Sequence, residues 1–166
     1  LREELREQQK LEQEIRAARE KIAKERTHYS KAIAEINVKI VNASNEDELN
    51  DLKAKLTELQ EKYGELDKEE KVIDYREKNA KAGYVYVISN IGSFGENVYK
   101  IGVTRRLEPL DRINELGDAS VPFPFDIHAL IFSDNAPELE GKIQQHFQQR
   151  RLNKINNRKE FFKPYL

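Results

Sequence analysis

Two segments in the second half of the chain carry side chains that are suited to phosphate chemistry. Tyr84 and Tyr86 lie in one segment, and Lys100 and Gly102 lie in the next; both segments have the aromatic and β-branched composition of strands. Because side chains alternate along a strand, each pair shares one face. If the apolar faces pair, a phenol lies beside the Lys100 ammonium, which favours the phenolate. Gly102 would then leave room there for a backbone or a phosphate to approach.

Basic residues gather near the end of the chain. Seven basic residues and one acid, Glu160, lie between Lys142 and Lys163, in a chain whose formal net charge is −1. Such a stretch fits contact with a phosphate backbone, and no groove-reading motif is present to supply sequence specificity. Phe161 and Phe162 are expected to be core residues rather than platforms for bases. The expected nucleic-acid-binding residues are Arg105, Arg106, Arg151, Lys154, Arg158 and Lys159.

The elements that position these side chains are expected to form an α+β domain over residues 83–166. Strands are predicted at residues 83–88, 98–103 and 125–132, and they would form a three-stranded antiparallel sheet. Flanking helices are predicted from Pro109 to about residue 116 and from the Asn135 cap to about residue 149. All five prolines and six of the seven glycines fall in this half, as a mixed fold with turns requires.

Residues 1–82 are expected to form a long antiparallel helical hairpin, a coiled-coil arm. Apolar residues recur at heptad spacing over about residues 1–41 and again over about 46–80. Ser44 and Asn45, each followed three residues later by an acid, predict a helix start between the two stripes. The arm is either a spacer or a site for homo-oligomerisation or for a protein partner.

Several classes of protein are excluded or left open by composition. The chain has no cysteine, so disulfides and cysteine-ligated metal sites are excluded. No apolar run approaches the length of a membrane span, and no signal peptide is visible. Because the chain begins at Leu1 inside a heptad pattern and contains no methionine, it is expected to be part of a longer protein.

The second half resembles the GIY-YIG nucleases. Tyr84-Val85-Tyr86 stands where that family has Gly-Ile-Tyr, and Lys100-Ile101-Gly102 stands where it has Tyr-Ile-Gly. An arginine then follows on the next helix, and a glutamate follows on a later one. The finer resemblance is to the bacterial and phage branch with Lys-Ile-Gly, which also has the closing run seen here at residues 152–162. The matching arginine and glutamate of this chain are Arg112 and Glu140.

This resemblance implies a catalytic set of Tyr84, Tyr86, Lys100, Arg112 and Glu140. Glu140 would hold Mg²⁺ or Mn²⁺, since Mg²⁺ takes one or two carboxylates and keeps several waters. Arg112 would grip the scissile phosphate with its planar fork. Tyr86 would position or deprotonate the attacking water, and Lys100 would stand in for the missing tyrosine or hold phosphate.

Each of these assignments has a plainer alternative. The tyrosines could be cross-strand packing, Arg112 could pair with Glu108 or Glu115 on its own helix, and Glu140 could be solvated. The branch often has a histidine where this chain has Gln144, and His146 is a weaker candidate.

A helical arm joined to this branch resembles the SNIPE-type anti-phage nucleases. That resemblance implies a metal-dependent DNA endonuclease in antiviral defence, cytoplasmic or attached to a membrane through an upstream segment. Two other functions stay open: a nucleic-acid-binding module with a decayed site, and a structural or sensing coiled-coil protein.

Overall fold

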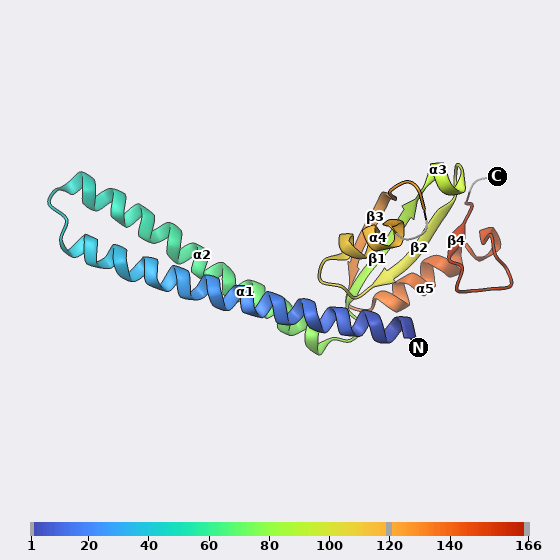
Figure 1. Ribbon diagram of the computed structural model, residues 1–166, viewed down its shortest axis with the longest axis horizontal. Helices are drawn as coiled ribbons and strands as arrows, with labels where there is room; N and C mark the ends of the chain where they lie inside the picture. The colour runs from blue at the N-terminus through green and yellow to red at the C-terminus, as the bar shows by residue number, and fades with distance from the viewer. Residues whose placement is uncertain (1, 119–120, 165–166) are drawn as a thin grey trace. The chain divides into compact units, whose positions relative to one another are not determined.

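The computed structural model describes residues 2–118 and 121–164. Two long helices come first, and the described strands and shorter helices follow (Figure 1). The elements are α1 (Arg2–Val41), α2 (Glu46–Lys78), β1 (Gly83–Ser89), α3 (Ile91–Phe94), β2 (Tyr99–Thr104), α4 (Pro109–Asp118), β3 (Asp126–Ser133), α5 (Ala136–His146), the 3-10 turn η1 (Gln148–Arg150) and β4 (Phe161–Phe162).

The chain forms two compact units. One comprises Ile15–Lys78, and the other comprises Leu1–Glu14 together with Asn79–Leu166. The boundary expected near residue 82 separates the long helices from the strands, whereas the compact units assign the start of α1 to the unit that holds the sheet. No helix among the described residues is long and apolar enough to cross a membrane.

The Ile15–Lys78 unit is an antiparallel helical hairpin. Arg19 of α1 pairs with Asp74 of α2 at 2.8 Å, and Arg26 pairs with Asp67 at 2.7 Å. A step of seven residues forward along α1 is therefore matched by a step of seven residues back along α2. Its apolar seam is buried at Ile15, Ile22, Leu66 and Ile73.

The turn of the hairpin has the expected cap. The Oδ1 atom of Asn45 accepts a hydrogen bond from the backbone N–H of Glu48 at 2.8 Å. The carboxylate of Glu48 accepts one from the backbone N–H of Ser44 at 3.2 Å. This reciprocal pair satisfies N–H groups that the first turn of α2 leaves without helical partners. The predicted helical hairpin is confirmed, with α2 ending at Lys78.

The sheet of the other unit is antiparallel and has the order β3-β1-β2-β4. The three predicted strands are present, and a fourth strand joins them. The added strand, β4, is two residues long and pairs with the start of β2, with Phe161 opposite Lys100 and Phe162 opposite Tyr99. So short a strand has no periodicity that a sequence could show. The helix expected to reach about residue 149 instead ends at His146 and continues as η1.

The two faces of the sheet have separate apolar clusters. On one face, Val85 and Ile101 pack with Ala136 at the start of α5 and with Phe162. On the opposite face, Tyr86 and Ile88 pack with Ile113 of α4. Since successive side chains of a strand point to opposite faces, β1 supplies both clusters. The helices on the two faces bring residues of α4 and α5 close to the middle strands of the sheet, whereas several side chains of β3 stay exposed.

Candidate active site

The hydroxyl of Tyr86 lies near the centre of the candidate site. Tyr86 of β1 is directly opposite Gly102 of β2, and its side chain is only 3% exposed. A Cβ atom on Gly102 would clash with the hydroxyl and the ring of Tyr86. Gly102 therefore makes room for this ring, which corrects the expectation that it leaves space for a phosphate. Tyr86 itself is buried between the sheet and α4 rather than open to solvent.

Charges from several elements act on Tyr86. Burial raises the pKa of Tyr86 far above its ordinary value, Arg112 lowers this pKa, and the carboxylates of Glu160, Glu140 and Glu7 raise it. The phenol is thus neutral near pH 7, and the expectation that Lys100 favours a phenolate is wrong for this structure. A neutral hydroxyl can still hold a water or a phosphate oxygen by a hydrogen bond.

Lys100 lies two residue pairs away from the Tyr86–Gly102 pair along the sheet. Its register partner on β1 is Ile88. The Nζ atom of Lys100 donates to the carboxylate of Glu160 at 3.1 Å, and the ammonium lies 5.4 Å from the centroid of the Phe161 ring. Lys100 is therefore half of an ion pair on the edge strand pair β2–β4.

Glu140 is a carboxyl group that is costly to ionise in its surroundings. Its pKa is raised to about 7, chiefly by burial and further by the charge of Glu160, while Lys100 lowers it. The Nε2 atom of Gln144, one helical turn later, donates to Glu140 at 3.2 Å and to the backbone carbonyl of Ile101 at 3.2 Å. Gln144 thus anchors Glu140 of α5 to β2, in the place where a histidine had been expected.

These surroundings fit a divalent cation. Two carboxylates that repel each other, of which one is partly buried, are stabilised by a cation between or beside them. Magnesium needs only one or two protein carboxylates, because it keeps several of its waters. No group of three or more histidines, acids or cysteines suited to a metal is found within residues 2–118 and 121–164.

Arg112 of α4 is held by acids from the start of α1. Its guanidinium pairs with Glu3 at 2.9 Å and with Glu7 at 3.4 Å, and Glu115 of its own helix lies farther away, at 3.9 Å. The alternative of an ion pair between Arg112 and Glu115 within α4 is thus the longest of these three contacts. The second carboxylate oxygen of Glu7 is buried without a hydrogen-bond partner among the described residues. The guanidinium of Arg112 is thus occupied by two carboxylates of α1.

Tyr84 and the weaker candidate His146 lie in other contacts, and so does His128 of β3. The Tyr84 ring packs edge-on against Phe132 of β3, with 5.3 Å between ring centroids, as the packing alternative had predicted. His146 packs against the adjacent Phe147, at 4.8 Å between ring centroids. His128 lies 2.6 Å from the hydroxyl of Ser89.

Two arginines expected to bind nucleic acid have structural roles instead. Arg106 is 6% exposed and is paired with Glu14 and Glu115. Arg151 is equally buried; it donates to Gln144 at 3.0 Å and to the carbonyl of Asn157 at 2.8 Å. Both corrections have one reason, which is that a guanidinium has enough donors to bind several acceptors inside a fold. Arg105, partly exposed, donates to Gln8 at 3.3 Å. The three that remain fully exposed are Lys154, Arg158 and Lys159.

Sequence reasoning missed three residues of this site. Glu160 had a signal, because it is the one acid in a basic tail. Gln144 was noticed only as a departure from a motif. Glu7 had no signal, since an acid on a coiled-coil helix is ordinarily solvated and only the tertiary structure brings it to Arg112.

Comparison with known proteins shows that half of the chain matches a domain family. The model of the T5orf172 domain matches residues 83–165. This is a phage-associated domain found in nuclease-like proteins. The chain matches none of the curated proteins and none of the solved structures with which it was compared. The matched range contains β1 to β4 and all five residues of the expected catalytic set.

Proposed function

We propose, from the premise that the chain belongs to the T5orf172 domain family, that residues 83–166 form a metal-dependent DNA endonuclease of the GIY-YIG type. The observation that carries this proposal is the gathering of charge around Tyr86. Arg112 from α4, Glu140 from α5 and Glu160 from the segment before β4 all act on its hydroxyl. Residues that are far apart in the sequence thus act on one hydroxyl group, as residues of a catalytic site do.

The hydrolysis of a phosphodiester adds water across one P–O bond. Arg112 would bind the non-bridging oxygens of the scissile phosphate with its planar guanidinium. Tyr86, being neutral, would orient the attacking water or a phosphate oxygen by its hydroxyl rather than take a proton. Lys100 lies on the neighbouring strand β2, and its ammonium would offset the negative charge that grows on the phosphoryl oxygens.

Glu140 is the residue that would hold Mg²⁺ or Mn²⁺, and Glu160 lies near enough to raise its pKa. A bound divalent ion supplies charge neutralisation for the phosphate and for the leaving oxygen. Gln144 would keep the Glu140 carboxylate in place, because it also binds the backbone of β2.

The phage association of the family supports a role in antiviral defence, and the hairpin would place or assemble the nuclease. A second candidate function is DNA binding without cleavage. It is favoured by the neutral, buried Tyr86 and by the two acids that occupy Arg112.

The test is cleavage of supercoiled plasmid by the full chain with Mg²⁺ or Mn²⁺. Wild type, Glu140→Gln and Arg112→Ala are compared with Glu138→Gln, which removes an exposed acid from the same helix, α5. We expect nicking by wild type and by Glu138→Gln, and at least about a hundredfold loss in the other two. Equal rates in all four, or DNA binding by wild type without metal-dependent cleavage, would refute the endonuclease.

A further inference from the structure

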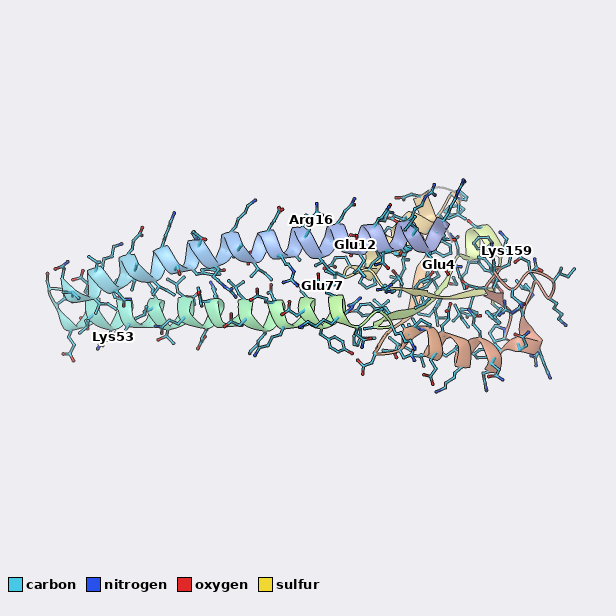
Figure 2. The ribbon with its side chains drawn as sticks, turned by 90° about the horizontal axis from the view of Figure 1, so that it is seen from below. Glu4, Glu12, Arg16, Lys53, Glu77 and Lys159 are labelled. Carbon is cyan, nitrogen blue, oxygen red and sulfur yellow. The ribbon has the colours of Figure 1, made fainter. Side chains whose placement is uncertain are left out.

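A cleft of about 600 Å³ opens between α3 and the segment that joins η1 to β4. This volume is in the range of small-molecule sites in proteins. Lys159, which is labelled in Figure 2, lines this cleft together with Phe94 of α3. Nothing in the proposed catalysis uses the cleft. Its lining includes two aromatic rings, two lysines and several aliphatic side chains, among them Phe94, Phe161, Lys154, Lys159, Leu152 and Ile155.

We propose that this cleft binds an unstacked base of single-stranded DNA, with Lys154 and Lys159 on the phosphates that flank that base. The inference rests on the proposed function, because it gives the nuclease site a substrate class. Three independent features support nucleic acid as the ligand of this cleft: the aromatic rings, the positive charge around them, and the continuity of the cleft with the proposed catalytic residues.

The rings provide a surface on which a base can stack. Phe94 is 39% exposed, and its ring centroid lies 4.9 Å from that of Phe161. Phe162, the next residue, is 1% exposed and belongs to the core, so the two phenylalanines of this pair have different roles. Exposed aromatic rings stack on any base, which gives affinity without sequence preference.

The charge around the cleft fits a phosphate chain. Residues 150–159 contain five basic residues and no acid. Lys154 and Lys159 are exposed at the cleft. Ile155 lies between them in sequence and is 98% exposed. An aliphatic side chain so exposed beside two lysines is free to insert next to an unstacked base.

The cleft is continuous with the catalytic residues through Phe161. Phe161 pairs in register with Lys100, and the Lys100 ammonium lies 5.4 Å from its ring centroid. A strand whose base stacks on Phe161 therefore has its backbone directed along β2 toward Lys100 and Tyr86. The preferred substrates are single-stranded DNA and duplexes with unpaired or frayed bases.

The test measures binding by the full chain in EDTA, so that it does not depend on cleavage. Fluorescence anisotropy compares a labelled single strand with the duplex of the same sequence. Phe94→Leu removes the ring but keeps an apolar side chain, and Phe132→Leu on β3 is its matched control. The double change Lys154→Gln with Lys159→Gln is matched by Lys53→Gln with Lys55→Gln, which removes two exposed lysines of α2.

We expect tighter binding of the single strand than of the duplex by wild type. Phe94→Leu should weaken single-strand binding about tenfold, as the loss of one stacked base predicts, with little change for the duplex. A 2-aminopurine in the strand should be quenched by wild type and less by Phe94→Leu. The lysine double variant should flatten the salt dependence, and both controls should match wild type.

Equal affinities of Phe94→Leu and wild type for the single strand would overturn the proposal. So would a chain that is dimeric in solution and becomes monomeric with Ile155→Asp, since the cleft would then be an interface between copies. If the cleft variants weaken binding but wild type does not cleave DNA, the proposed endonuclease function fails and the proposed binding site stands. If wild type cleaves DNA and the cleft variants bind and cleave equally well, the proposed binding site fails and the endonuclease function stands.

Discussion

Gly102 shows how one residue can be required for a reason other than the expected one. The absence of a side chain was correctly linked to a close approach, but the approaching group is the ring of Tyr86. Sequence periodicity placed both residues on one face of the sheet. It could not supply the register, which sets Tyr86 opposite Gly102 rather than beside Lys100.

We therefore predict that Gly102→Ala destabilises the domain by about 1–3 kcal/mol, because the new methyl group overpacks against a buried ring. The matched control is Gly141→Ala in α5, where a Cβ would meet nothing within 4 Å. That change should be neutral or stabilising, since alanine is the better helix former. Urea unfolding of both variants is the measurement, and equal stabilities would contradict the packing of Tyr86 over Gly102.

Glu140 is predicted to make stability depend on pH. Its pKa is raised to about 7 in the folded chain, so the folded state holds this proton more tightly than the unfolded state does. Stability from this group is therefore greatest at acid pH and falls as pH rises from about 4.5 to about 7. Above that range the ionised carboxylate remains a cost until a cation is bound.

Without metal, Glu140→Gln should then be more stable than wild type at pH 8 by about 1 kcal/mol, a figure kept small because the carboxyl is partly exposed. The gain should disappear at pH 5, and Mg²⁺ or Mn²⁺ should stabilise wild type but not the variant. Thermal unfolding at the two pH values, with and without metal, tests this. A variant gain that is equal at both pH values would contradict the raised pKa.

At the scale of elements, the long periodic helices were the easiest part to predict. Heptad spacing and the Asn45–Glu48 cap give the bounds of α1 and α2 to within a few residues, because these signals are local. The short elements α3 and β4 were not predicted. Four residues and two residues are too few to show a period, and β4 exists only through its pairing with β2.

The start of α1 is the element whose role sequence could least reveal. Its heptads predict a coiled-coil seam, yet Leu1–Glu14 belongs to the unit that holds the sheet. There Glu3 and Glu7 pair with Arg112, and Glu14 pairs with Arg106. Acids on α1 thus meet the arginines that follow β2, and under the proposed function a DNA phosphate at Arg112 would compete with two of these acids.

We predict that the double change Glu3→Gln with Glu7→Gln raises DNA affinity about fivefold, an effect of about 1 kcal/mol, because it frees the Arg112 guanidinium. The matched control is Glu20→Gln with Glu35→Gln, which removes two exposed acids from the same helix. Anisotropy titrations at low salt are the measurement. An equal gain in both double variants would show a general charge effect and would contradict competition at Arg112.

At the scale of the whole molecule, the order of the motif residues singled out Arg112 and Glu140, whose charges act on Tyr86 in the folded chain. Their catalytic role stays a prediction, and the sequence did not indicate the ionisation states and partners of the residues around them. The ionisation of Tyr86, the Lys100–Glu160 pair and the burial of Arg106 and Arg151 depend on desolvation and on partners that are distant in sequence. Such properties follow from the fold and not from spacing.

The central claim is that Arg112 and Glu140 act together in one catalytic site, and non-additivity tests it most directly. The single-turnover rate of plasmid nicking with Mn²⁺ is measured for wild type, Arg112→Lys, Glu140→Gln and the double variant. Residues that serve the same step as a unit lose little more together than the worse of them loses alone. We predict that the double variant is no more than about threefold slower than the slower single variant. Losses that multiply in the double variant, or a wild-type chain without metal-dependent nicking, would contradict the account.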